Sequence, residues 1–231
     1  MATFDRVLIL ETSAKVGQAA LSTGESVLAE ARLEEGRRRA SDLTLAVQTL
    51  LQVQGWRARD LTAVVVGLGP GSYTGLRVGL ATAKALAYAS GCEFFGVETY
   101  AAIATQVPSS VDKLSVVGDG LQGKVFERLY ERRAAHGWEP VGKLRLLDGS
   151  VWLEGLEKGT VVSGPATEAY AARIPAGVEC TAAEYREPHP QSLLLAAIRF
   201  PWAVTRDMWR AEPFYLRGSS AEEKAAARKP D

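Results

Sequence analysis

The stretch from Gly67 to Gly79 reads GLGPGSYTGLRVG and holds five glycines between an apolar run and an alanine-rich segment. The apolar run, Ala63 to Val66, has the composition of a buried strand, and the segment after the glycines has that of a helix. Closely spaced glycines allow the backbone to adopt positive φ angles and to come close to another group. The first residues of a helix have backbone N–H groups without a partner inside the helix. The stretch therefore predicts a strand, a loop and a helix. The loop can hold an anion, contact a partner's backbone, or pack the helix tightly on a sheet.

The loop does not carry either of the two common nucleotide-binding motifs. No Gly-Lys-Ser/Thr follows at Walker spacing, so the lysine that would reach the phosphates is missing. The Rossmann-like starts at Gly67-x-Gly69 and Gly69-x-Gly71 lack a third glycine or alanine in register. A P-loop enzyme and a dinucleotide-binding enzyme are therefore both disfavoured.

The helix after the loop has one face of small residues. Ser72 or Thr74 can cap its start and Gly91 can end it. The small residues recur at helical spacing, at Gly79, Ala83, Ala87 and Ser90. Such a face predicts close packing, either against the interior of the same chain or across a subunit interface.

Composition places the chain among soluble globular proteins of one or two domains. It has 231 residues, 47% of them hydrophobic, and its 27 Lys and Arg balance its 27 Asp and Glu. No overall basic field exists to hold nucleic acid. Cys92 and Cys180 are far apart and, like His136 and His189, do not have metal-ligand spacing. These features predict a cytoplasmic protein with no metal and no cofactor.

The first half of the chain reads as β-β-β-α-β-α. Strands are predicted at Arg6–Leu10, Gly17–Ser22 and Val27–Leu33. A helix then opens at Ser41 and Asp42, and the strand and helix around the glycine loop follow.

The second half echoes the first. Strands are predicted at Leu114–Asp119, Val125–Arg132 and Thr160–Ser163, and helices from Tyr100, from Thr167 and over Gln191–Phe200. In both halves an apolar strand ends in an acid, Glu11 or Asp119, as a duplicated unit would. We expect a first subdomain over residues 1–98, a second over 99–218 whose last helix can return to the first, and a disordered polar tail over 219–231. Trp202 and Trp209 are expected in core packing or in a lid between the domains.

Three motifs resemble the TsaB family, also called YeaZ. They are LILETS at residues 8–13, GPGSYTGLRVG at residues 69–79 and EPFYLR at residues 212–217. The resemblance implies an α/β fold built as a duplicated β-β-β-α-β-α unit, the actin-like ATPase or ribonuclease H-like fold with two subdomains.

The resemblance further implies a subunit without chemistry of its own. It would bind and support TsaD, the metal-dependent catalytic protein of the same fold that transfers a threonylcarbamoyl group to a tRNA adenosine. The TsaE ATPase would dock on the assembled pair. The chain would contact tRNA only as part of the complex, and it could form a homodimer when alone. The family's partner face maps here to the helix from Ser41 and the helix after the loop, with Ser41, Leu45, Gly79, Ala83, Lys84 and Ala87 as interface residues.

Two positions depart from the family's pattern. Ala40 stands where a histidine is common before the helix-opening serine, and Leu121 stands where an arginine often follows the second-half aspartate. The first change bears on the partner face and the second removes a charge near the cleft.

An enzyme of the same fold is the alternative. Actin-like kinases place carboxylates at strand ends to hold magnesium and nucleotide, and Glu11 with Asp119 could form such a pair beside Gly69 and Gly71. An acid followed by Thr12 and Ser13 can equally be a turn residue that bonds its own backbone. A third reading is a stand-alone dimer with no tRNA role.

Overall fold

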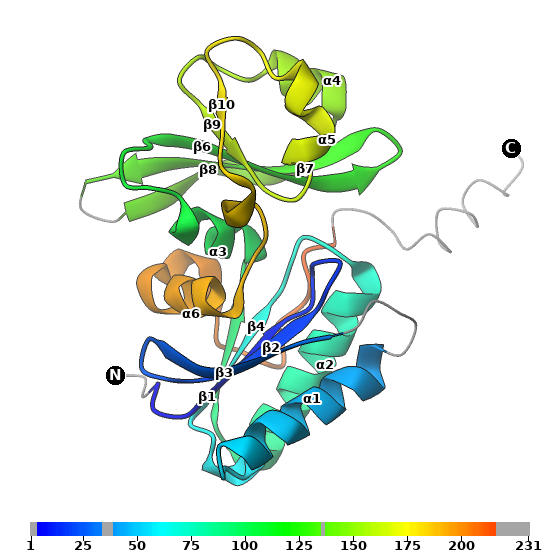
Figure 1. The fold of residues 1–231 in the computed structure, drawn as a ribbon, viewed down its shortest axis with the longest axis vertical. Coiled ribbons are helices and arrows are strands. Elements are labelled where there is room, and N and C mark those ends of the chain that lie inside the picture. Colours follow the sequence, from blue (N-terminus) through cyan, green and yellow to red (C-terminus); the bar gives the residue numbers. More distant parts are fainter. Residues whose placement is uncertain (1–3, 34–38, 135–136, 216–231) are drawn as a thin grey trace, which may run out of the picture.

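Two mixed β-sheets lie one above the other in the computed structural model, with two helices between them (Figure 1). The structure describes residues 4–33, 39–134 and 137–215. Further helices cover the outer side of each sheet. The molecule is therefore two-lobed, with α3 (Thr99–Gln106) and α6 (Pro190–Arg199) at the junction.

The first sheet has the strand order β11-β5-β4-β1-β2-β3. Strands β1, β4 and β5 run parallel, and β2 and β3 extend the sheet as antiparallel hairpins. Its strands are β1 (Val7–Glu11), β2 (Gln18–Thr23), β3 (Ser26–Arg32), β4 (Ala63–Gly67), β5 (Glu93–Val97) and β11 (Val204–Thr205).

The second sheet repeats this plan with the order β10-β9-β6-β7-β8. Its strands are β6 (Lys113–Leu121), β7 (Lys124–Arg133), β8 (Gly137–Asp148), β9 (Val161–Ser163) and β10 (Glu179–Cys180). Strands β6 to β10 take, in the same order, the places that β1 to β5 hold in the first sheet. Each has the same parallel or antiparallel neighbours as its counterpart. The predicted α/β fold built as a duplicated unit is confirmed.

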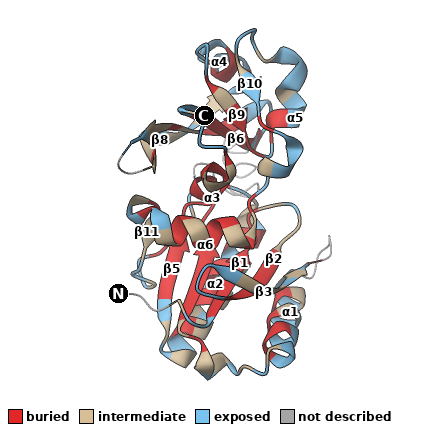
Figure 2. Ribbon diagram, turned by 60° about the vertical axis from the view of Figure 1, so that its left-hand side comes forward, coloured by how far each residue is buried: buried red, intermediate tan, exposed pale blue. Residues whose placement is uncertain are grey.

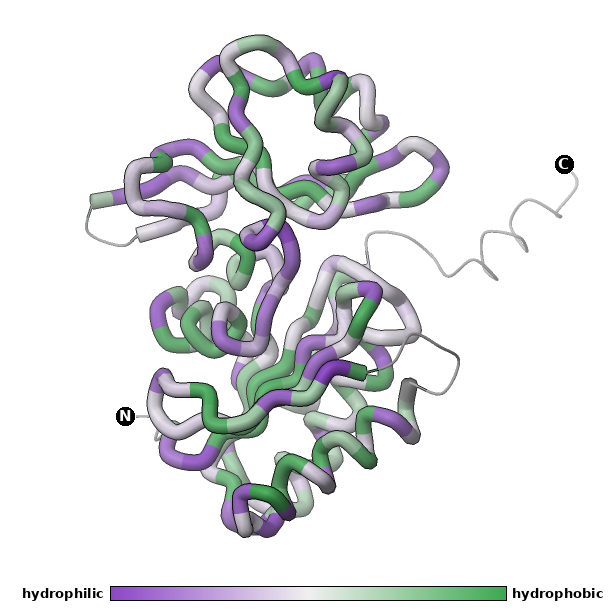
Figure 3. The backbone as a smooth tube through the Cα atoms, viewed as in Figure 1, coloured by the Kyte–Doolittle hydropathy of each residue, from purple (hydrophilic) through white to green (hydrophobic). Residues whose placement is uncertain are grey.

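Both faces of the central strands β1 and β4 are buried, which explains their continuous apolar runs. Helices α1 (Arg39–Val53) and α2 (Tyr73–Ser90) share a hydrophobic cluster with Leu8 and Leu10. Helices α3 and α6 share another with Val7 and Ile9. Figure 2 shows the resulting band of buried residues through the lower lobe, and Figure 3 shows hydrophobic segments running through its centre.

The outer side of the second sheet is covered by shorter elements. Helices α4 (Gly149–Glu154) and α5 (Thr167–Tyr170) pack there around the buried Trp152. Single turns of 3-10 helix occur at Ala58–Asp60, Ala171–Arg173, Ala183–Tyr185 and Pro201–Ala203. Helix α1 begins at Arg39, two residues before the predicted opening at Ser41.

The chain returns to the first lobe near its end. Helix α6 contacts β1, β4 and β5, and β11 pairs with the edge strand β5. Residues 206–215, called here the strap, then run along α2: Lys84 Nζ donates to Ala211 O at 2.8 Å, and Phe214 N donates to Leu68 O at 2.9 Å. The predicted tail lies outside the described residues. Among those residues, the helices are too short or too polar to cross a membrane.

Candidate functional site

The glycine loop packs directly on the turn between β1 and β2. Ser72 N donates a hydrogen bond to Ser13 O at 2.8 Å, and the Ser72 side chain caps α2 by accepting from Gly75 N. A Cβ atom on Gly71 would lie 2.5 Å from Ser13 O. The backbone approach that glycines permit is thus used within the chain.

The first turns of α2 lie equally close to β1. A Cβ on Gly79 would clash with Thr12 Oγ1, and that hydroxyl donates to Gly75 O at 2.8 Å. Of the three uses open to the glycine loop, this geometry matches a turn that packs a helix closely on a sheet.

Glu11 is fully buried beneath the loop. Its Oε1 accepts from Ser13 N at 2.6 Å, and its Oε2 accepts from the Thr99 hydroxyl at 3.4 Å. Thr99 Oγ1 in turn accepts from Gly69 N at 3.0 Å, and Gly69 has a φ of +91°. A side chain on Gly67 would clash with Glu11 Oε2. Glu11 is therefore a turn residue bonded to its own backbone, enclosed by protein.

Asp119 differs from Glu11 in being exposed. Its Oδ1 accepts from Leu121 N at 2.7 Å across a bulge in which Leu121 itself adopts a φ of +62°. The two acids thus sit at equivalent strand ends, but one is enclosed and the other faces solvent. Among the described residues, no group of three or more His, Cys, Asp and Glu side chains is placed to hold a metal ion.

The small-residue face of α2 points into the chain. Gly79, Ala83 and Ala87 are buried, with Ala83 and Ala87 in the cluster between α2 and the first sheet. These three positions present no surface to a partner in this chain, and the predicted interface stays a prediction. A helix stripe of small residues suits a flat sheet as well as another helix.

The opposite side of α2 carries a second small stripe that is exposed. It contains Ala81 and Ala85 and ends at Tyr88, whose side chain is 70% exposed. Helix α1 lies beside α2 and exposes Ser41 and Leu45, the latter by 63%. Leu45, Ala81, Ala85 and Tyr88 are called here the helix face. Lys84 is half-buried under the strap, and Ala40 lies exposed in the first turn of α1.

The strap adds aromatic side chains to this face. Trp209 is 72% exposed, and its ring meets that of Tyr88 edge-on with centroids 5.9 Å apart. Asp207 Oδ1 accepts from Trp209 N at 3.0 Å and from Arg210 N at 3.2 Å, which fixes the turn. Trp202 packs against the core as predicted, whereas Trp209 does not. Its exposure was missed because the surrounding apolar residues resemble a core segment.

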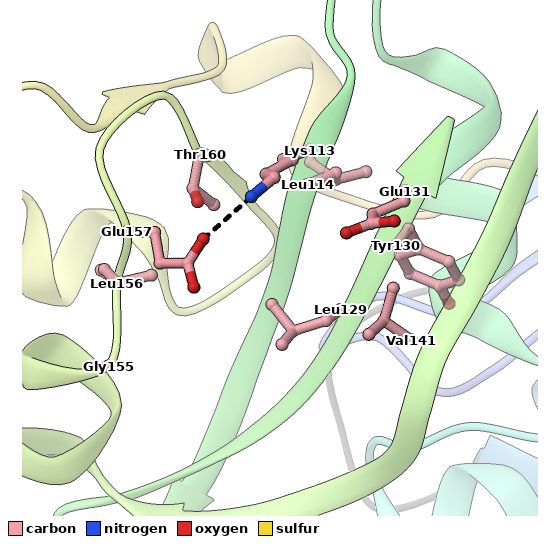
Figure 4. Close-up of a pocket in the computed structure, with 10 residues that line it drawn as sticks. All are labelled: Lys113, Leu114, Leu129, Tyr130, Glu131, Val141, Gly155, Leu156, Glu157 and Thr160. Carbon is pink, nitrogen blue, oxygen red and sulfur yellow. Dashed lines mark hydrogen bonds and ion pairs between the residues drawn. The ribbon is translucent and has the colours of Figure 1, made fainter. Parts of the chain in front are cut away.

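A small pocket lies far from the glycine loop in the sequence, beside strands β6, β7 and β8 of the second sheet (Figure 4). Leu129, Val141 and Leu156 contribute apolar surface, and Lys113 and Glu157 form an ion pair of 2.9 Å across it. The residues predicted as functional do not line this pocket.

Comparisons with known proteins agree with the fold and extend it. The family of tRNA N6-adenosine threonylcarbamoyltransferases (TsaD) matches residues 33–136. The tRNA threonylcarbamoyladenosine biosynthesis protein TsaB of Escherichia coli is 26% identical over 95% of this chain and 97% of its own length. TsaB of Bacillus subtilis is 30% identical over 54% of this chain and 55% of its own.

Two further matches differ in coverage. An uncharacterised protein of Mycobacterium tuberculosis is 38% identical over 45% of this chain and 48% of its own, so the chain spans about half the length of several curated relatives. The structure of YeaZ from Pseudomonas aeruginosa superposes with a TM-score of 0.73 at 22% identity, covering 92% of this chain and all of that one.

The duplicated sheets with two helices between them define a two-lobed protein of the actin-like ATPase fold. Its glycine loop is closed onto its own β1–β2 turn. Within that class the chain is similar over most of its length to TsaB (YeaZ) proteins, the family whose three sequence motifs it resembles.

Proposed function

We propose that this chain is a non-catalytic subunit of the machinery that makes threonylcarbamoyladenosine on tRNA. It binds and supports a TsaD-like catalytic subunit, and the TsaE ATPase joins the assembled pair. The E. coli and B. subtilis relatives are both named as tRNA threonylcarbamoyladenosine biosynthesis proteins, which supports a role for this chain in the same process. The match of residues 33–136 to TsaD supports a partner of the same fold. We further propose that the chain works in the cytoplasm and meets tRNA through the complex.

The observation that carries the non-catalytic role is the closed glycine loop. In a phosphate-binding loop the backbone N–H groups point at the ligand. Here Ser72 N is bonded to Ser13 O, and Gly71 leaves no room beside that carbonyl. Glu11, the carboxylate that would face a magnesium ion, is buried and bonded to Ser13 and Thr99. These contacts favour a supporting subunit over the kinase alternative.

The helix face is the surface we assign to the partner. Leu45 and Tyr88 expose large apolar side chains on neighbouring helices, and Ala81 and Ala85 leave the α2 backbone open to close approach. Large apolar side chains exposed on two neighbouring helices support a protein interface at this place. The same face would serve a homodimer when the partner is absent.

The test is complex formation with TsaD from the same organism, followed by light scattering on a sizing column. We expect a one-to-one complex for the wild-type chain. Ala85→Arg should weaken it by at least about tenfold, because a charged side chain would be buried without a counter-charge.

The matched control is Ala172→Arg, which makes the same change at an exposed alanine of the second lobe. It should leave both the complex and the unfolding temperature unchanged. Failure of the wild-type chain to bind at micromolar concentrations would contradict the proposal. Magnesium-dependent nucleotide binding lost in Asp119→Asn would favour the kinase instead.

A second prediction concerns Trp209. Asp207 fixes the backbone at Trp209, and Tyr88 packs edge-on against the exposed indole. A side chain restrained in this way loses little freedom on binding, which is the property of an interface anchor. Trp209→Ala should weaken the TsaD complex by about tenfold without changing the stability of the isolated chain. Titration calorimetry measures both affinities. An unchanged affinity would place the strap outside the interface.

A further inference from the structure

The carboxyl group of Glu11 holds together three segments that are far apart in the sequence. It bonds the β1–β2 turn at Ser13 N, and through the Thr99 hydroxyl it reaches the amide of Gly69 in the glycine loop. Glu11 and Thr99 are 88 positions apart in the sequence, and Thr99 and Gly69 are 30 positions apart. Because Gly67 has no side chain, β4 lies against the same carboxyl group.

This carboxyl group is buried, and within the described part of the chain it has no charged partner. Glu11 has no exposed surface, and burial is the largest influence on its pKa, which lies above the ordinary value of 4.5. Hydrogen bonds from Ser13, Thr99 and Ala14 lower the pKa by less, and no charged side chain contributes. An ionised carboxylate buried without a counter-charge costs several kcal/mol, so the neutral acid is the favoured form.

The ionisable groups on the surrounding elements face elsewhere. Opposite Glu11 on β2 stands the neutral Gln18. At the start of α3, the Glu98 carboxylate is bonded to Arg128 and Tyr130, while the Tyr100 hydroxyl is influenced by Glu98, Glu187 and Asp119. On α2, Arg77 bonds Tyr73 and Lys84 bonds Ala211 O. In the β1–β2 turn, Lys15 is exposed.

We propose that Glu11 is a positioning residue that acts as a neutral acid, fastening the glycine loop to the end of β1 and to the start of α3. Its Oε1 accepts from Ser13 N and its Oε2 accepts from the Thr99 hydroxyl, whose oxygen in turn accepts from Gly69 N. The loop leads directly into α2, so Glu11 sets where the first turn of that helix lies.

Loss of the Glu11 proton to solvent would leave an uncompensated charge under the loop. The folded chain binds this proton more tightly than the unfolded chain, so the free energy of unfolding falls as pH rises from 4.5 to the higher folded pKa. Below 4.5 both states are protonated and this contribution is constant. Glutamine at position 11 is neutral at every pH and keeps an acceptor for Ser13 N.

The experiment compares urea unfolding of the isolated wild-type chain and Glu11→Gln between pH 4.5 and 8.5. We expect similar midpoints at pH 4.5 and a higher midpoint for Glu11→Gln at pH 8.5, because only the wild-type chain loses stability through this group. A variant that is less stable than wild type at all pH values, with an unchanged pH slope, would overturn the neutral-acid assignment.

Hydrogen exchange tests the positioning role in the same isolated chain. Thr99→Val removes the acceptor of the Gly69 amide, so exchange at Gly69 and in the first turn of α2 should accelerate about fivefold, the worth of one hydrogen bond. Unchanged exchange at both places would overturn the proposal. Failure to bind TsaD would contradict the proposed function alone, because neither measurement uses the partner.

Discussion

Replacing Glu98 by alanine is expected to lower the free energy of unfolding by about 3–5 kcal/mol. Glu98 precedes α3 and is 4% exposed, and its Oε1 accepts from Arg128 Nε at 3.1 Å and from the Tyr130 hydroxyl at 2.6 Å. Its backbone N–H donates to Ala203 O, so the residue ties the first lobe to strand β7 of the second. Removing the carboxylate leaves a nearly buried guanidinium and a buried hydroxyl without their acceptor.

The control for this loss is Glu131→Ala on the same strand β7. Glu131 pairs with Arg133 at 2.7 Å, but the Arg133 side chain is 57% exposed, so solvent screens the pair. We expect a change below about 1 kcal/mol. Chemical denaturation of both variants measures the difference. Equal small losses would mean that the buried pair at the lobe junction adds nothing beyond an exposed one.

The regular elements were predictable where one face or both faces of an element are apolar. Strands β1, β4, β6 and β7 and helix α6 lie within a few residues of their predicted ranges, because each buries a periodic or continuous apolar run. Strand β8 was missed, since most of its residues are exposed or half-buried and no apolar alternation marks it. Its place is set by backbone pairing with β7.

The candidate site was harder to predict, because it depends on contacts between distant segments. The spacing of Gly79, Ala83 and Ala87 correctly indicated close packing, but it could not say whether the sheet or a partner is packed there. The second stripe, Ala81 and Ala85, has the same spacing and is the exposed one. Likewise, the acid at the end of β1 was visible in the sequence, whereas its burial under Gly67 and Thr99 was not.

The predicted boundary between the subdomains at residues 98 and 99 stays a prediction. It falls between β5 and α3, at the residue whose side chain crosses to β7. Because α6 also packs on the first sheet after the second is complete, the chain passes between the lobes more than once. Such crossings, together with Glu98, favour lobes that unfold cooperatively.

Replacing Gly71 by alanine is expected to destabilise the chain by about 2–3 kcal/mol. The added Cβ would lie 2.5 Å from Ser13 O and 2.7 Å from Ser13 Cβ. Because the first of these atoms belongs to the backbone, the clash cannot be relieved by a rotamer change. The loop would have to move away and give up the 2.8 Å bond from Ser72 N to Ser13 O.

Gly155→Ala is the matched control for this clash. Gly155 has a φ of −83°, and a Cβ there would meet its nearest atoms at 3.4 and 3.6 Å, which is ordinary contact. Its unfolding midpoint should therefore stay close to that of the wild-type chain. A similarly small change in Gly71→Ala would show that the glycine loop can lift from the β1–β2 turn at little cost. The turn would then be open to a phosphate, and the argument from a closed loop to a non-catalytic subunit would fail.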